Sequence, residues 1–160
     1  MTLPPSPPTP TPRLTPTRPG TLALVALLAL LVGWALVKRY YGDLPSLTWF
    51  PAMTLVLLAF LETISALSTK ARIDRRPDTE PVEPLVVARY AALAKASSLG
   101  GAIFGGLYGG VAFYLLTAQH LTAANDDLPE AIGGVVAAAV LVAAALWLEH
   151  ACRVPKPPEE

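Results

Sequence analysis

The stretch LGGAIFGGLYGG (residues 99–110) places Gly101, Gly105 and Gly109 at four-residue spacing, with Gly106 and Gly110 beside them. Residues four apart lie on one face of an α-helix, so these glycines would form a helical surface without side chains. Lipid tails are as apolar as leucine, and small residues that let two backbones approach each other are what favours helix packing in a bilayer. The stretch therefore predicts a membrane-spanning helix that packs closely against a neighbour.

The apolar run around this stretch, residues 86–116, is one of four in the chain. The others cover about residues 21–39, 47–69 and 128–151. Each reaches the roughly 17–25 mainly apolar residues that span the hydrocarbon core of a membrane. Hydrophobic residues make up 53% of the chain and charged residues 15%, whereas soluble domains carry about 25% charged residues. We therefore expect an all-α integral membrane protein whose residues 21–154 form four helices in one compact bundle.

A matching small-residue surface occurs in the fourth apolar run, where Gly134, Ala138 and Ala145 lie on related helical positions. Small residues on both partners allow close backbone contact. Packing of the third run on the fourth within one chain is favoured, because a short connection makes them neighbours. Packing between two copies of the chain is the alternative.

Both ends of the chain and one connection differ in composition from these runs. Residues 1–20 contain eight prolines, and a segment so poor in apolar bulk and backbone donors predicts a disordered tail. Residues 155–160 form a short second tail. Residues 71–84 combine three prolines with acidic and basic side chains, which predicts a solvated loop.

The basic residues predict which side of the membrane each connection faces. One side receives most of them, namely Arg13, Arg18, Lys70, Arg72, Arg75, Arg76, Arg89, Arg153 and Lys156. The other side receives Lys38 and Arg39, and no basic residue occurs between Gln119 and Glu130, where Asn125, Asp126 and Asp127 are expected in a loop. Because the cytoplasmic side carries the excess of Lys and Arg, both termini and the loop of residues 71–84 are expected in the cytoplasm.

Three ionisable residues fall inside the apolar runs, namely Glu62, Lys95 and Glu149. Such residues are costly in hydrocarbon unless they are protonated, reach the interface or meet an opposite charge. Lys95 shares a helical face with Gly106, and Glu149 is in line with Ala138, so both charges are expected to point toward packed protein. We hypothesise that Lys95 forms a buried ion pair with Glu62, with Glu149 and His150 as further members of the cluster.

This charge cluster has two interpretations. A buried ion pair can fix the register of packed helices without any chemical duty. Intramembrane charge is also typical of conducting or ligand-binding sites, and a proton-coupled carrier would use Glu62 as its titrating group. The first interpretation is favoured over the second.

Other classes of function lack a sequence signal. With 12 basic and 12 acidic residues and no basic stripe, the chain lacks the electrostatic footprint of a nucleic-acid-binding protein. His120 has no metal-binding companions at suitable spacing, so neither a metal nor a cofactor is expected. Ser97 and Ser98 near Lys95 are the only candidate nucleophiles, and serine in a glycine-rich span usually joins helices. We therefore do not expect an enzyme.

Two further stretches carry a resemblance to a known family. VVARYAALAKASSLGGAIFGG (residues 86–106) and ALWLEHACR (residues 145–153) resemble the actinobacterial domain of unknown function 3180 family over about residues 21–154. The residues that carry the match are Ala88, Arg89, Ala94, Lys95, Ala96, Ser97, Leu148, Glu149, His150, Cys152 and Arg153. The resemblance implies a multi-pass protein of the bacterial inner membrane whose activity is uncharacterised.

Taken together, these features favour a scaffold or accessory subunit of a membrane assembly. Its partners would be the lipid bilayer and another membrane protein or a second copy of the chain. The alternative is a small proton-coupled transporter that uses Glu62, Lys95 and Glu149.

Overall fold

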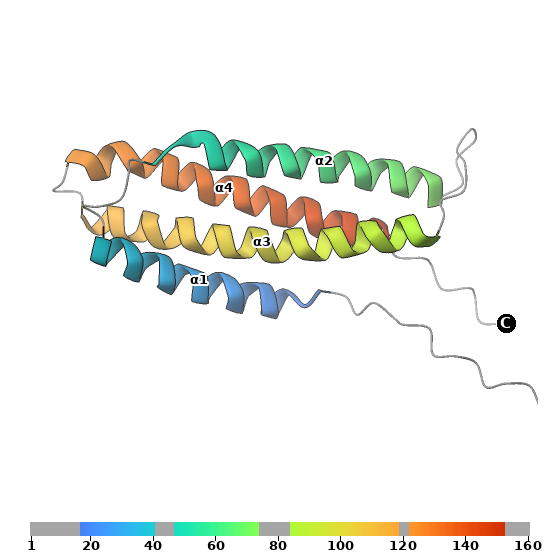
Figure 1. Cartoon of the computed structure of the whole chain (residues 1–160), viewed down its shortest axis with the longest axis horizontal. Coiled ribbons are helices and arrows are strands. Elements are labelled where there is room, and N and C mark those ends of the chain that lie inside the picture. The colour runs from blue at the N-terminus through green and yellow to red at the C-terminus, as the bar shows by residue number, and fades with distance from the viewer. Residues whose placement is uncertain (1–16, 41–46, 74–83, 119–121, 153–160) are drawn as a thin grey trace, which may run out of the picture.

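The computed structural model describes residues 17–40, 47–73, 84–118 and 122–152, and these residues form four α-helices (Figure 1). Each helix is long and apolar enough to cross a membrane. The chain is therefore all-helical in its described part, and its helices indicate a multi-pass membrane protein. The helices are α1 (Pro19–Tyr40), α2 (Trp49–Ile73), α3 (Pro84–Thr117) and α4 (Thr122–Ala151).

Helix α4 begins earlier than the apolar pattern predicts. It starts at Thr122, so Asp126 and Asp127, which were expected in a loop, lie in its first turns. Carboxylates near a helix N-terminus interact favourably with the helix dipole, which explains why polar residues extend the helix. Pro129 lies inside α4 and removes only one backbone hydrogen-bond donor at a point still close to the helix start.

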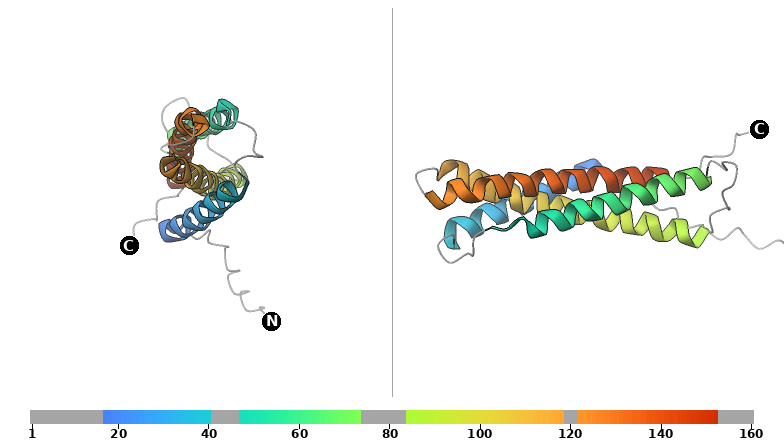
Figure 2. Two further views of the ribbon diagram at one scale, coloured as in Figure 1. Left: turned by 90° about the vertical axis from the view of Figure 1, so that its left-hand side faces the viewer. Right: turned by 90° about the horizontal axis from the view of Figure 1, so that it is seen from above.

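The helices form a row, not the compact bundle that we expected. Helix α1 packs only on α3, α3 packs on α4, and α4 packs on α2, while α2 touches α3 slightly and the described part of α1 contacts neither α2 nor α4. Viewed from the end, the row is bent into an open curve (Figure 2). The reason is that α3 carries small residues on two different faces, so α1 and α4 pack on separate sides of it.

The interface between α1 and α3 depends on backbone contact. A Cβ atom placed on Gly33 would lie 2.6 Å from the carbonyl oxygen of Leu107. On the opposite helix, Gly106 lies against the backbone of Ala26 and Leu30, and Gly110 against that of Leu30. The two helices run in the same direction along this contact and approach more closely than side chains would allow.

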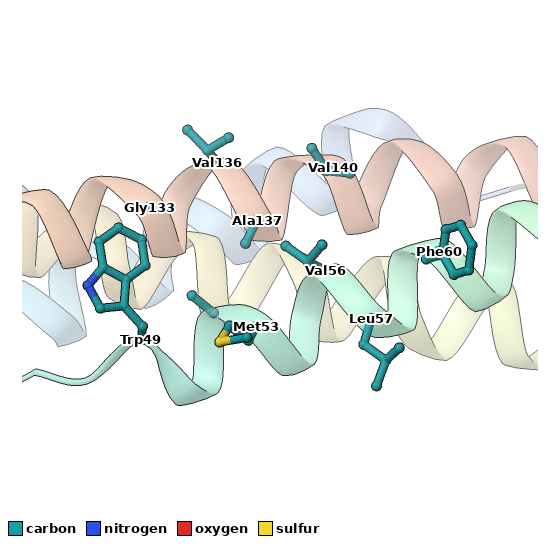
Figure 3. A pocket seen from close by; sticks show the side chains of 10 residues that line it. Trp49, Met53, Val56, Leu57, Phe60, Gly133, Val136, Ala137 and Val140 are labelled. Atoms are coloured by element: carbon teal, nitrogen blue, oxygen red, sulfur yellow. The ribbon is translucent and has the colours of Figure 1, made fainter.

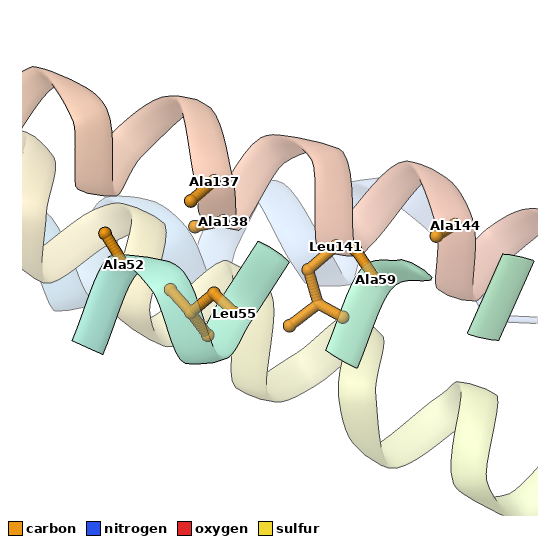
Figure 4. Packing of buried hydrophobic residues seen from close by; sticks show 7 residues of the cluster. All are labelled: Ala52, Leu55, Ala59, Ala137, Ala138, Leu141 and Ala144. Carbon is orange, nitrogen blue, oxygen red and sulfur yellow. The ribbon is translucent and has the colours of Figure 1, made fainter. Parts of the chain in front are cut away.

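Alanine and leucine form the contact between α2 and α4. The buried cluster consists of Ala52, Leu55, Ala59, Ala137, Ala138, Leu141 and Ala144 (Figure 4). A second buried cluster continues the same contact toward the end of α4 and includes α3, through Ala66, Ala94, Leu148, Ala151 and Cys152. The core is thus a narrow strip along α4, with much of each outer helix left exposed.

The start of α1, the end of α2, the start of α3 and the end of α4 lie at one end of the molecule (Figure 1). Arg18, Lys70 and Arg89 are exposed at this end. At the opposite end the side chain of Lys38 lies over the Trp34 ring, 4.8 Å from its centroid. Residues 1–16 and 155–160 of the predicted tails lie outside the described residues, as do residues 74–83 of the predicted loop with Arg75 and Arg76, and also His120, Arg153 and the side chain of Arg72. Pro19 and Gly20, which were expected in the disordered tail, begin α1.

Candidate functional site

Glu62 is a buried carboxyl group in the middle of α2. Only 1% of its surface is exposed, and neither carboxyl oxygen has a hydrogen-bond partner of regular geometry. It occupies the same face of α2 as Ala59, Ala66 and Thr69, all of which are buried. Spacings of three and four residues place this face against α4 and α3.

The surroundings of Glu62 come from three helices. On one side lies the cluster of Ala59, Leu141 and Ala144, and on the other the cluster of Ala66, Ala94 and Leu148. From α3 the Ser97 hydroxyl lies close to the carboxyl group. The neighbouring Ser98 is fully buried and donates a hydrogen bond of 2.9 Å to the carbonyl oxygen of Lys95. Glu62 therefore meets one nearby hydroxyl and otherwise apolar packing.

Lys95 does not pair with Glu62, which corrects the hypothesised ion pair. Its side chain is exposed, and no charged group acts on the Glu62 carboxyl within the described part of the chain. Lys95 does share a helical face with Gly106, but that face is covered by α1. Eleven residues before Gly106, α3 is level with roughly Pro19, where α1 begins. Helix α1, which covers this face of α3 farther along, begins only at Pro19 and therefore does not cover Lys95.

Glu149 belongs to a different part of the structure. The backbone N–H of Thr17 donates a hydrogen bond of 2.8 Å to Oε1 of Glu149, which links the segment before α1 to the end of α4. His150 is exposed. Glu149 follows Leu148, the residue that faces α2, and successive residues on a helix point about 100° apart. The predicted cluster of Glu62, Lys95, Glu149 and His150 is therefore not assembled.

The glycines of α3 divide between two neighbours. Gly101 faces Ala138 and Val142 of α4, and a Cβ atom placed on Gly105 would lie 3.2 Å from that of Ala138. Gly106 and Gly110 face α1, while Gly109 is in ordinary contact with Leu30. On α4, Gly134 makes room for the ring of Tyr108. Small residues thus shape two interfaces, whereas the sequence pattern predicted one.

An apolar groove of about 670 Å³ runs between α2 and α4 on the exposed surface of the row (Figure 3). Its walls include Met53, Val56 and Phe60 from α2 and Val136 and Val140 from α4. Trp49 closes one end by lying against Gly133, where an added Cβ atom would be 2.6 Å from the ring. Our sequence reasoning missed this site, although Trp49 and Gly133 are both visible in the sequence.

A second, smaller groove of about 340 Å³ lies between α1 and α4 above α3. Its lining is also apolar and includes Leu22, Ala102 and Val142. Within the described residues no three His, Cys, Asp or Glu side chains are placed to share a metal ion. The described structure therefore offers two apolar grooves and the buried carboxyl group of Glu62.

Comparisons with known proteins place the chain in a family and give no activity. No curated protein and no solved structure matches the chain. A family model described as a protein of unknown function, DUF3180, matches residues 22–156, a range that includes all the residues of the site. The chain belongs to this DUF3180 family.

Proposed function

We propose that the protein is a non-enzymatic accessory subunit of a membrane assembly, and that the groove between α2 and α4 receives one transmembrane helix of a partner protein. The observation that carries the proposal is the groove itself. It runs from Trp49 to Phe60 along α2, about 16 Å at 1.5 Å per residue, which is three turns of a docked helix.

The lining of the groove fits a helix. Ala52, Gly133 and Ala137 are small residues in the lining, so no bulky side chain fills the groove at these positions. Small residues allow the backbones of membrane helices to approach each other. Larger side chains at the rim, Met53 and Phe60, are 66% and 60% exposed. Recognition of an apolar helix in such a groove relies on shape, because almost no polar group lines it.

The orientation of the protein is part of the same proposal. Both ends of the described chain lie at one end of the molecule, where Arg18, Lys70 and Arg89 are exposed. Most basic residues of the sequence belong to the termini and the connection at this end of the molecule, and this excess supports a cytoplasmic location for both termini. The resemblance to actinobacterial proteins supports the bacterial inner membrane. Reporter fusions at the two termini would test this, and a signal from the external side would contradict it.

The transporter alternative receives less support from the structure than from the sequence. It required Glu62, Lys95 and Glu149 to meet, whereas the Lys95 side chain is exposed and Glu149 accepts a hydrogen bond from Thr17. We therefore retain the accessory role as the proposed function.

Site-specific photocrosslinking in native membranes tests the docking proposal. A photoreactive residue at Val56, which is 50% exposed in the groove, is expected to join the protein to one discrete partner. The matched control is Leu28 on α1, which is 55% exposed but lies outside both grooves. Adducts with lipid alone, or only with a second copy of the chain, would contradict a heterologous partner.

A blocking variant provides the second part of the test. Val56→Trp fills the groove and is expected to abolish the partner adduct formed from a photoreactive residue at Val140, because the docked helix no longer fits. Leu28→Trp adds the same bulk to α1 and should leave the adduct in place. If both variants keep the adduct, the groove is not the docking surface.

A further inference from the structure

The strongest feature that the proposed function does not use is the carboxyl group of Glu62. It is 1% exposed, it lies on a helix long and apolar enough to cross a membrane, and neither of its oxygens makes a hydrogen bond of regular geometry. A buried polar group without a partner is rare in folded proteins and calls for an explanation. An ionisable residue in such a place is a functional candidate by default.

Among the side chains that the structure describes, the helices packed around Glu62 offer no cation to balance a carboxylate. On α2 itself, Lys70 is exposed, and on α3 Lys95 is exposed. Tyr90 of α3 and Cys152 of α4 pack with the neighbouring Ala66 cluster, and neither is cationic. Glu149 of α4 accepts a hydrogen bond from Thr17. The polar group that lies close to the Glu62 carboxyl is the Ser97 hydroxyl of α3.

The packing also limits which ligand could balance the charge. The apolar clusters on both sides of Glu62 close around it, and neither groove includes it in its lining. A metal ion needs several oxygen or nitrogen ligands at fixed distances, and no suitable group of acidic, His or Cys residues exists in the described structure. A proton needs no additional space. It converts the carboxylate into a neutral acid whose O–H can donate to the Ser97 hydroxyl oxygen.

We propose that Glu62 is a proton-binding site inside the membrane, held as the neutral acid at the junction of α2, α3 and α4. An isolated carboxylate is far more costly to bury than a neutral acid, so loss of the proton would draw water into the junction. Because α2 has only a slight contact with α3, this junction is where α2 would separate from α3. The presence of a proton on Glu62 therefore controls how stably α2 packs against α3.

A pair of carbodiimides tests whether the acid is neutral and shielded from water. The proton of a carboxylic acid transfers to one carbodiimide nitrogen, and the carboxylate oxygen then bonds to the central carbon to give an O-acylisourea, which rearranges to a stable N-acylurea. The hydrophobic reagent dicyclohexylcarbodiimide, added to the full chain in native membranes, is expected to modify Glu62. A water-soluble carbodiimide is expected to modify the exposed Asp126 and to leave Glu62 intact.

Three results would decide the labelling test. Peptide mass spectrometry that finds the hydrophobic adduct on Glu62, and its loss in Glu62→Gln, supports the proposal. Glu149→Gln serves as the matched control and should retain the adduct. A Glu62 that reacts with the water-soluble reagent and not with dicyclohexylcarbodiimide would overturn the proposal, because the group would then be open to water.

Thermal unfolding of the purified protein in detergent tests the consequence for α2. Loss of the proposed proton at higher pH places a charge in apolar packing in the folded chain, whereas the unfolded chain can hydrate that charge, so the unfolding temperature of the wild type should fall as the pH rises. Glu62→Gln imitates the neutral acid and should reduce this fall while keeping the wild-type unfolding temperature at low pH. Asp126→Asn, which replaces an exposed carboxyl group near the start of α4, is the control and should leave the fall unchanged. A fall that is equal in wild type and Glu62→Gln would overturn the proposed control of α2.

This inference is independent of the docking proposal, because it concerns a residue outside the groove. Loss of the partner adduct in Val56→Trp with a normal Glu62 adduct would affect only the proposed function. The reverse result would affect only the proton site.

Discussion

Gly33 of α1 lies directly on Leu107 of α3, so closely that a Cβ atom on Gly33 would be 2.6 Å from the carbonyl oxygen of Leu107. The obstacle is backbone and not the end of a flexible side chain. A helix that must cross another at this distance has no room for a methyl group. Since α1 packs only on α3, this contact holds the first helix in the row.

The variant Gly110→Ala is therefore expected to weaken the attachment of α1. Its new methyl group would meet the backbone of Leu30, and overpacking of this kind costs about 1–3 kcal/mol. The unfolding temperature in detergent should fall by several degrees, at about 2–4 °C per kcal/mol for a chain of this size. Gly100→Ala is the control, because nothing lies within 4 Å of its added methyl group. Equal unfolding temperatures for the two variants would contradict the α1–α3 contact.

Replacing Lys95 is expected to have little effect. The side chain is exposed, and substitutions at such positions usually change stability by less than about 0.5 kcal/mol. Lys95→Leu should therefore accumulate in membranes and unfold like the wild type. The adjacent Ala94 is fully buried, so Ala94→Lys should reduce both quantities sharply. A large loss in Lys95→Leu would restore the buried ion pair that the structure excludes.

The hydrogen bond between Thr17 and Glu149 gives a local prediction at the start of α1. Loss of a hydrogen bond to a charged group costs about 1.5–3 kcal/mol, so Glu149→Ala should increase hydrogen exchange at the Thr17 amide, read from a peptide that begins several residues before Thr17. Exchange measured by mass spectrometry in detergent would report the change. His150→Ala alters an exposed neighbour and should leave exchange at Thr17 unaffected. Unchanged exchange in Glu149→Ala would show that the hydrogen bond does not hold this segment.

Cys152, just beyond the end of α4, gives a prediction about pH. Burial raises the pKa of its thiol, and the thiolate is the form that reacts with maleimide. Modification of the folded protein should therefore be slow at neutral pH and accelerate as the pH rises. A cysteine placed at the exposed position 150, in a chain with Cys152→Ala, should react much faster at neutral pH. Similar rates at the two positions would mean that Cys152 is accessible.

Part of the site could be predicted from the sequence. The burial of Glu62 in protein was expected as part of the hypothesised ion pair, because an acidic residue in a long apolar run is costly in lipid. The expected ion pair was wrong because helical phase shows which residues share a face of one helix and says nothing about which neighbour covers that face. Lys95 shares its face with Gly106, but α1 begins too late along α3 to cover it. The groove beside Trp49 was missed because it needs residues of two helices that are distant in the sequence.

The sequence by itself determined the number of apolar helices, their approximate limits and the side-chain-free surfaces of α3, because span length and residue size are local properties. An even number of long helices joined by short connections also places both ends of the helical part together. Only the tertiary structure decided the order α1, α3, α4, α2 across the row. This order also decides which ionisable side chains are buried and which are exposed. The reason is that lipid and protein interior are similarly apolar, so a hydrophobic face does not reveal which of the two it will meet.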